Sequence, residues 1–195
     1  MAEKKKTQEE IIEKNKQLAN EFPFIIPRDY KGNLPEDYDY SYTELDFIPD
    51  GWRKRYGRLI CEDIKRILGD RANEFRFVEI KEKYGELRID GSIGSVELHN
   101  QFRKYEYLTG NTCIFCGKIG VSSTKGYILP VCRECYPKAN YSASYDEWTT
   151  PNYEFDPVFK IRKYNSDGDI TIYVDTSDIV ERAMVQDTER IHERN

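Results

Sequence analysis

Four of the five cysteines of this chain occur as two pairs, Cys113-x2-Cys116 and Cys132-x2-Cys135. Two residues between paired thiolates let one tight turn point both sulfurs at a single ion, and the fifteen residues between the pairs match the spacing of structural zinc sites. Redox or disulfide pairs are the alternative, but a redox CxxC motif normally occurs singly beside a βαβ unit, which this sequence does not predict. We therefore expect bound Zn²⁺, closed in by four sulfurs and hence structural.

The residues around the cysteines indicate the type of zinc module. The segments 119–124 and 127–131 flank Lys125-Gly126 as a short hairpin, and Pro137 lies two residues past Cys135, where it suits a first helical turn. The order knuckle, hairpin, knuckle, helix is that of a treble clef. A zinc ribbon would end in another strand instead, so a treble clef fits slightly better.

The composition predicts a folded protein that does not enter a membrane. Hydrophobic residues make up only 38% of the 195 residues and charged residues 33%, but fifteen tyrosines supply large side chains that disordered chains lack. No apolar run approaches the roughly 20 residues that cross a bilayer. The first ten residues lack the apolar centre of a signal peptide. We expect a cytoplasmic protein, in which Cys61 is a small buried residue of a helix rather than a nucleophile.

Hydrophobic spacing predicts further helices and hairpins on both sides of the cysteines. The clearest signals are a capping box at Thr7 and Glu10, a possible helix cap at Asp50 and a helix-closing Gly69. A turn is expected near Tyr84 and Gly85 and another at Asp90-Gly91. The predicted helices span 8–21, 50–68, 95–108 and 176–193, and the predicted hairpins span 75–90 and 158–174.

These elements predict an α+β fold of small β-hairpins packed with helices, with an embedded treble-clef or zinc-ribbon module. The expected organisation is an N-terminal helix (1–21), an α+β core (22–110), the four-cysteine module (111–140), and a linker with a hairpin and a C-terminal helix (141–195). Residues 22–51 show no sustained period, and long irregular segments often carry binding sites.

Charge is unevenly distributed. The net charge of −5 and the pI of about 5.3 argue against a general nucleic-acid binder, because non-specific affinity comes from neutralising phosphates. However, residues 34–50 carry six acids and no Lys or Arg, whereas residues 53–66 carry six basic residues against Glu62 and Asp63. The acidic row either recognises a partner or caps the basic helix within this protein, and the sequence leaves both open.

We name residues 36–46 the acidic tyrosine segment. In an extended chain its three tyrosines would lie on one face, opposite Asp37, Asp39 and Ser41. Rigid tyrosine rings favour interfaces, and a row of carboxylates can imitate phosphates or meet a basic partner. A calcium or magnesium site is a less favoured alternative. The candidate partner-binding residues are Asp37, Tyr38, Asp39, Tyr40, Tyr42, Glu44 and Asp46.

A second candidate surface is the hairpin IKEKYGELR (80–88). Tyr84 could stack on a base while flanking cations contact phosphates, although a solvated hairpin face is the simpler interpretation. Cations of the helix that begins near residue 50 could extend the surface. The candidate residues for nucleic-acid or nucleotide binding are Lys81, Lys83, Tyr84, Arg88, Arg53 and Arg55.

Catalytic motifs are not visible in the sequence. Zinc deaminases need H-x-E and a proline directly before CxxC, but Val131 separates Pro130 from Cys132. Treble-clef nucleases need a histidine in or beside the hairpin, and the two histidines, His99 and His192, lie outside it. Walker and G-x-S-x-G motifs are also missing. We expect a protein that is not an enzyme, with a metal-dependent hydrolase as a distant alternative.

Five segments together resemble a family of small accessory proteins of tailed bacteriophages and prophages. They are FPFIIPR (22–28), EDYDYSYTELD (36–46), PDGW (49–52), IKEKYGELR (80–88) and CIFCGK…CREC (113–135). The resemblance covers residues 22–136 and brings no catalytic residue. It implies expression in a bacterial cytoplasm and stoichiometric binding to a host protein or ribonucleoprotein of a defence system, such as a CRISPR effector. The alternatives are a nucleic-acid-binding accessory protein and a sponge for a defence nucleotide.

Overall fold

The computed structural model describes residues 7–29, 31–119, 122–123, 129–139, 155–165 and 168–192. It has the predicted mixture of helices and antiparallel hairpins. The helices are α1 (Gln8–Glu21), α2 (Asp50–Leu68), α3 (Val96–Gly110) and α4 (Ser177–His192), and the short 3-10 turns are η1 (Pro23–Ile25), η2 (Glu44–Phe47), η3 (Gly69–Glu74) and η4 (Tyr136–Ala139). The hairpins pair β1 (Phe77–Lys83) with β2 (Glu86–Gly91), β3 (Ser122–Ser123) with β4 (Pro130–Val131), and β5 (Val158–Asn165) with β6 (Gly168–Asp175).

Helix ends follow local side-chain chemistry, with one correction. At the start of α1, the Thr7 hydroxyl accepts from the Glu10 N–H and the Glu10 carboxylate accepts from the Thr7 N–H, so the predicted capping box is confirmed. Asp50 is not the cap of α2, because Pro49 holds that position and Asp50 is itself helical. The Asp50 carboxylate still stabilises the first turn of α2, because its negative charge lies near the positive end of the helix dipole. Gly69, with φ of 55°, ends α2 as expected.

The β1–β2 hairpin turns at Tyr84 and Gly85, as predicted, with φ of 57° and 80°. The turn predicted at Asp90-Gly91 is wrong, because both residues continue β2 and face Glu79 and Phe77 across the ladder. Gly91 has a packing role: a Cβ there would lie 2.2 Å from the ring of Phe75. Gly91 therefore leaves room for the aromatic ring, and the chain does not turn at this residue.

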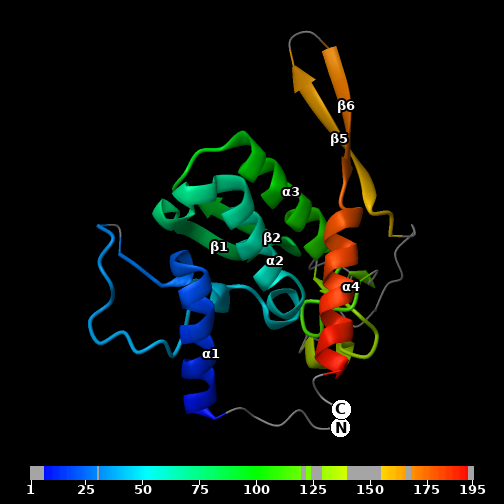
Figure 1. Ribbon diagram of the computed structural model, residues 1–195. Coiled ribbons are helices and arrows are strands. Elements are labelled where there is room, and N and C mark those ends of the chain that lie inside the picture. Colours follow the sequence, from blue (N-terminus) through cyan, green and yellow to red (C-terminus); the bar gives the residue numbers. More distant parts are fainter. Residues whose placement is uncertain are drawn as a thin grey trace.

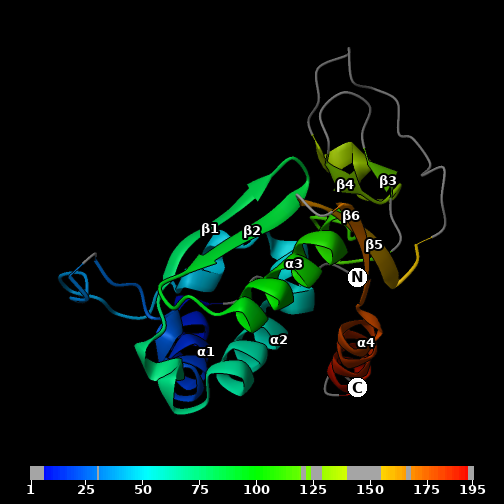
Figure 2. The same ribbon diagram turned by 90° about the horizontal axis from the view of Figure 1, so that it is seen from above.

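Helix α2 lies at the centre of the main core. Figures 1 and 2 show it among α1, the β1–β2 hairpin, α3 and α4. Its side chains Trp52, Tyr56, Ile60 and Ile64 are fully buried. Around them pack buried residues from every neighbouring element: Ala19, Phe22, Phe24, Ile25, Ile80, Leu87, Ile89, Leu98, Phe102, Tyr105, Leu108, Ile179 and Ala183. The core thus draws on residues on both sides of the boundaries expected at 21/22 and 140/141.

The β5–β6 hairpin projects away from the body of the protein (Figure 1). Its base is attached to α3 through Tyr107, whose ring stacks on Phe159 at 3.8 Å between centroids and whose hydroxyl donates to the Asp156 carbonyl. At the same base, the Thr176 N–H and hydroxyl both donate to the Pro157 carbonyl. These contacts fix the hairpin just before α4 begins.

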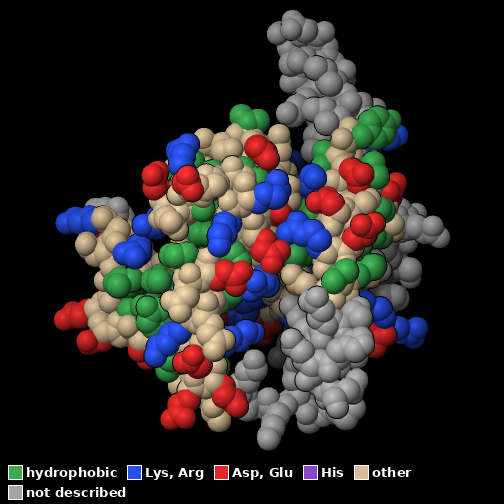
Figure 3. All heavy atoms as spheres, viewed as in Figure 1, with side chains coloured by type: hydrophobic (Ala, Val, Ile, Leu, Met, Phe, Trp, Pro, Cys, Tyr) green, Lys and Arg blue, Asp and Glu red, His purple; other side chains and the backbone are tan. Residues whose placement is uncertain are grey.

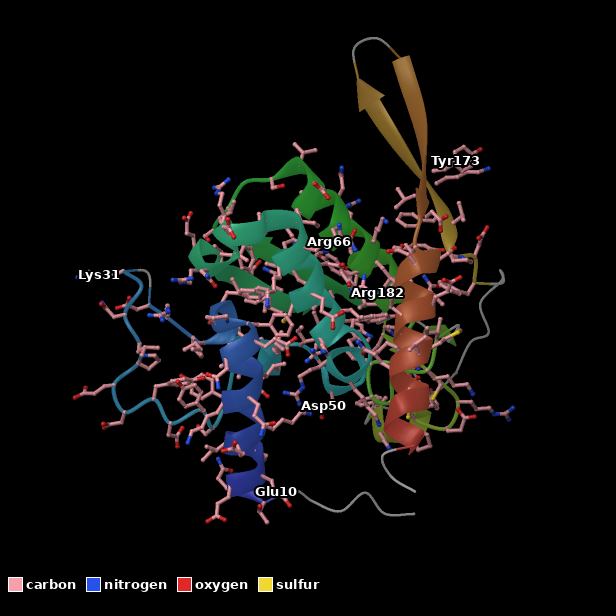
Figure 4. All side chains as sticks on the ribbon, in the orientation of Figure 1. Glu10, Lys31, Asp50, Arg66, Tyr173 and Arg182 are labelled. Carbon is pink, nitrogen blue, oxygen red and sulfur yellow. The ribbon has the colours of Figure 1, made fainter. Side chains whose placement is uncertain are left out.

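A buried carboxylate joins three of the helices. Asp63 on α2 is 1% exposed and accepts from Gln101 at 2.7 Å and from the Tyr105 hydroxyl at 2.6 Å, both on α3. Arg182 on α4 donates to its other oxygen at 2.9 Å. Arg66, also on α2, reaches the same oxygen at 3.3 Å, and Figure 4 labels both arginines. Burial and the adjacent carboxylate hold the pKa of Tyr105 well above its usual value, so the phenol stays a donor.

Replacing Asp63 by alanine should destabilise the protein strongly. It would leave the buried Tyr105 hydroxyl and Gln101 amide without an acceptor and Arg182 without one of its carboxylates, at a cost of about 3–5 kcal/mol in the free energy of unfolding. Exposed Asp70→Ala is the control and should change it by less than about 0.5 kcal/mol. Urea denaturation followed by circular dichroism measures both. Equal stabilities for the two variants would contradict this role of Asp63.

Candidate metal centre and candidate binding surfaces

The four predicted cysteines converge on one point. The sulfurs of Cys113, Cys116, Cys132 and Cys135 all lie within 4.8 Å of one another, and the Cys116 and Cys132 sulfurs are 3.6 Å apart. Four sulfurs placed about 2.3 Å from one ion in a tetrahedron would be about 3.8 Å apart, so the cluster fits that geometry. None of the cysteines forms a disulfide. The site could therefore hold a metal ion with four thiolate ligands.

Each cysteine pair is shaped by backbone hydrogen bonds. In the first knuckle the Cys113 N–H donates to the Lys118 carbonyl at 2.8 Å, and the Gly117 N–H donates to the Cys113 carbonyl at 2.9 Å. Gly117 closes this knuckle with φ of 80°, a conformation that favours glycine. In the second knuckle the N–H groups of Cys135 and Tyr136 both donate to the Cys132 carbonyl at 3.0 Å. Between the knuckles β3 pairs with β4 in antiparallel register, as predicted, whereas the turn expected at Lys125-Gly126 lies outside the described residues.

The thiols of the cluster have unequal acidities. Burial opposes ionisation of Cys113, but N–H groups of Cys132, Cys116 and Phe115 point at its sulfur and lower its pKa below the usual value. Burial raises the pKa of Cys135 to about 11 and raises that of Cys132 as well. A bound cation would reverse these two shifts, because a coordinating thiol is deprotonated outright.

The first knuckle is attached directly to the beginning of α2. The Gly51 N–H donates to the Ile114 carbonyl at 2.8 Å, and the Trp52 indole N–H donates to the Thr112 carbonyl at 2.7 Å. The Tyr56 hydroxyl lies 2.9 Å from the Thr112 hydroxyl. All three contacts lie between buried or nearly buried groups, where hydrogen bonds are costly to lose.

Arg55 links the knuckle to α4. Its Nε donates to the Gly117 carbonyl at 2.9 Å, and its Nη1 forms an ion pair with Asp187 at 2.6 Å. The side chain is only 13% exposed. Arg55, predicted as a nucleic-acid contact, is therefore engaged inside the protein. The same holds in part for Arg53, which forms ion pairs with Asp46 and Asp50.

The acidic tyrosine segment is not extended, which corrects the predicted alternation of faces. Asp37 and Tyr40 adopt left-handed conformations, with φ of 59° and 66°, and these two residues curl the chain. The three tyrosines nevertheless gather together, because the ring of Tyr38 lies 4.9 Å from that of Tyr40 and 5.6 Å from that of Tyr42. The Tyr38 hydroxyl donates to the Tyr42 carbonyl at 2.6 Å. Burial and the neighbouring phenols raise the pKa of Tyr38 to about 12, so this hydroxyl stays protonated.

The segment is held against α1 at its middle and is folded by local contacts at its C-terminal end. On one side the Asn15 amide of α1 donates to the Tyr40 carbonyl at 2.8 Å, and the Lys16 ammonium lies 5.9 Å from the Tyr40 ring. On the other side, the Asp46 carboxylate accepts from the N–H and hydroxyl of Thr43, and η2 begins there. Figure 4 shows the segment extending outward beside α1, below Lys31. The tyrosines are thus presented by a folded loop.

The two interpretations of the acidic row each apply to part of it. Asp46 and Asp50 face Arg53 within this protein, as the capping interpretation requires. Asp37 and Asp39 are exposed and form no ion pair with the described residues; the Asp39 carboxylate accepts only locally, from the Ser41 N–H at 2.9 Å. Glu44 is half-buried, which raises its pKa. The outward-facing charge is therefore carried by Asp37 and Asp39, with Glu36 beside them.

The hairpin candidates lie along a cavity of about 340 Å³ between β1–β2 and α3. Lys81, Lys83, Tyr84 and Arg88 line it, so the structure brings all four together. Arg53 and Arg55 are elsewhere, on α2. Sequence reasoning missed the α3 side of this cavity, although the spacing of His99, Phe102, Arg103 and Glu106 marks one helical face.

Sequence reasoning also missed Asp63, which was counted only as an acid within a basic helix. Its position was the available signal, since Ile60, Ile64 and Ile67 place residue 63 on the buried face of α2. An acid on such a face needs several donors. Cys61, in contrast, is fully buried as predicted, and burial raises its pKa.

Substituting Gly51 should disturb the attachment of the knuckle. A Cβ at this position would lie 2.4 Å from the Cys113 carbonyl oxygen, so Gly51→Ala forces two backbones apart and should cost about 1–3 kcal/mol in the free energy of unfolding. Gly57→Ala in the same helix is the matched control. Its Cβ would meet the flexible Arg53 side chain at 3.3 Å and Leu45 Cδ1 at an ordinary contact distance of 3.9 Å, and alanine should stabilise the helix by up to about 1 kcal/mol. Chemical denaturation of both variants distinguishes them; a Gly51→Ala variant as stable as Gly57→Ala would refute the close approach.

Comparison with known proteins identifies no family. No family model matches the chain, and neither the curated proteins nor the solved structures contain a match. Among the described residues, no helix is both long and apolar enough to span a bilayer. The functional proposal therefore depends on the geometry of this chain and on the sequence resemblance described above.

Proposed function

We propose that this protein is a zinc-containing phage accessory protein that acts by stoichiometric binding to a host protein or ribonucleoprotein, and that it inhibits a bacterial defence system such as a CRISPR effector. The observation that carries the proposal is the acidic tyrosine segment. It is folded by its own tyrosine contacts, is held against α1, and presents Asp37 and Asp39 without an ion pair to any of the residues that the structure describes.

The segment has the physical properties of a recognition surface. Its rings are already ordered, so less conformational entropy is lost when a partner binds. Exposed carboxylates beside half-buried tyrosines suit a basic, nucleic-acid-binding surface of a partner, because the charges steer association and the rings supply contact area. On the face shown in Figure 3, hydrophobic side chains gather over this part of the molecule, with acidic side chains along its outer edge. Leu34, Tyr42 and Phe47 are exposed there.

The metal has an architectural role in this proposal. Four thiolates in a tetrahedral arrangement suit Zn²⁺ and leave no position for a substrate. After the second knuckle the chain enters η4, a helical turn beginning at Tyr136, which favours a treble clef over a zinc ribbon. The ion would hold the first knuckle against α2, and α2 in turn carries the core on which α1 and the acidic tyrosine segment lie.

Several features favour binding over catalysis. Cys61 is fully buried, and the four other cysteines are committed to the cluster. Asp63, a deeply buried carboxylate, is saturated by donors from three helices. The nucleic-acid alternative is weakened by Arg53 and Arg55, whose charges are used within the protein.

Charge reversal of the exposed acids tests the proposal. Asp37→Lys with Asp39→Lys should abolish inhibition, because the pair would repel a basic partner. The melting temperature should fall by no more than about 4 °C, since neither carboxylate forms an ion pair among the described residues and the only losses are the tolerance of Asp37 for its left-handed φ and the local hydrogen bond of Asp39 with the Ser41 N–H. The measurement is the plating efficiency of a sensitive phage on bacteria that carry a CRISPR system and express the protein.

The matched control is Glu13→Lys with Asp70→Lys, which makes the same change in net charge at exposed positions of α1 and η3. It should inhibit like the unmodified protein. A segment variant that still protects the phage would contradict the assignment of the surface. Failure of the unmodified protein to protect phages against any defence system, when a panel of systems is tested in the same assay, would contradict the proposed function.

A further inference from the structure

The cavity between the β1–β2 hairpin and α3 is a second candidate site, separate from the acidic tyrosine segment. Figure 2 shows the hairpin lying along α3. The cavity of about 340 Å³ falls in the size range of small-molecule sites. Three apolar residues, Leu87, Ile89 and Phe102, are also among its lining residues and are 1%, 8% and 9% exposed. A lining that mixes apolar and polar residues suits a ligand that has a flat ring and a charged group.

Four basic side chains line the cavity, namely Lys81, Lys83, Arg88 and Arg103. The two arginines share the carboxylate of Glu106. Arg88 and Arg103 both form ion pairs with Glu106, which is 8% exposed, and Arg88 also reaches Glu86 at 2.8 Å. A guanidinium has five N–H donors, so each arginine keeps donors that these contacts do not use. Lys81 forms an ion pair with Glu79 at 2.7 Å. Lys83 forms no ion pair with the described residues, and its ammonium lies 5.6 Å from the Tyr84 ring.

Tyr84 stands at the tip of the hairpin in a costly conformation. Its φ of 57° is in the left-handed region, which Asn, Asp or Gly adopts more readily at a two-residue hairpin turn. The ring is 71% exposed, so burial of the side chain does not offset this cost. The Glu82 carboxylate accepts from the Gly85 N–H at 2.7 Å and holds the turn. An exposed aromatic ring kept at the lining of a cavity, against local preference, points to a contact made by the ring itself.

We propose that this cavity binds a nucleoside monophosphate or a similar small phosphate ester, with the base stacked on Tyr84 and the phosphate contacted by Lys83 and the free donors of Arg103. The carboxylates of Glu79, Asp90 and Glu106 also line the cavity; Glu79 pairs with Lys81, and Glu106 pairs with both arginines. The site therefore favours a ligand with one or two negative charges, because a triphosphate would meet these carboxylates as well as the cations.

Tyr84 gives a sharp test because one substitution removes the ring and keeps the turn. Tyr84→Asn suits the left-handed conformation, so this variant should be at least as stable as the unmodified protein, yet it should bind AMP and GMP about tenfold more weakly, as expected for one lost base-stacking contact. Tyr84→Phe keeps the ring and should bind as before. Arg71→Gln removes a surface cation in η3, outside the cavity lining. It is the negative control and should bind the nucleotides as the unmodified protein does.

The measurement is isothermal titration calorimetry of the full chain with AMP, GMP, cyclic AMP, ATP and inorganic phosphate at fixed salt. We expect the monophosphates and cyclic AMP to bind, and ATP and inorganic phosphate to bind at least about tenfold more weakly. Equal affinity for inorganic phosphate would reduce the site to an anion contact and overturn the proposal. So would unchanged binding by Tyr84→Asn, or no heat with any nucleotide at millimolar concentration. The phage-plating assay with the Asp37 and Asp39 variant is independent of these results, so the two proposals can fail separately.

Discussion

The attachment of the first cysteine knuckle to the first turns of α2 is the contact on which the rest of the structure depends. It joins backbone to backbone at Gly51 and Ile114, and side chain to backbone at Trp52 and Thr112. Because Trp52 and Tyr56 also lie at the centre of the main core, the metal cluster and the core share one helix. A change in the structure of the knuckle would therefore be transmitted to the core through α2.

The C-terminal helix α4 is attached to α2 by ion pairs. Arg55 connects α2 to the knuckle and to Asp187, and Arg182 connects α4 to Asp63. Buried or partly buried charges of this kind are costly to separate, so they define one position for α4. The consequence for function is that many cations are used internally. Among the described residues, the two surfaces that we propose for recognition are the acidic tyrosine segment and the cavity beside the β1–β2 hairpin.

The sequence predicted elements better than contacts between them. Capping at Thr7 and Glu10, the left-handed turn at Tyr84-Gly85 and the cysteine spacing are local signals, and each led to the right element or cluster. Gly91 was misread because glycine serves both turns and close packing, and only the tertiary structure reveals the ring of Phe75 above it. Gly117 and Gln101, which contact Arg55 and Asp63, lie 62 and 38 residues away along the chain, so no local pattern identifies them. The prediction that residues 36–46 are extended was wrong, because no clear sequence pattern marks a left-handed backbone conformation at residues other than glycine.

The coupling between the metal cluster and α2 can be tested by hydrogen exchange of the full chain, loaded with zinc and then treated with a chelator. We expect removal of the ion to increase exchange in residues 111–119 and, with it, in residues 50–57, whose Gly51 N–H is bonded to the knuckle. Residues 8–21 of α1 should change much less. Increased exchange confined to the cysteine segment, with α2 unchanged, would contradict the view that the metal centre organises the core.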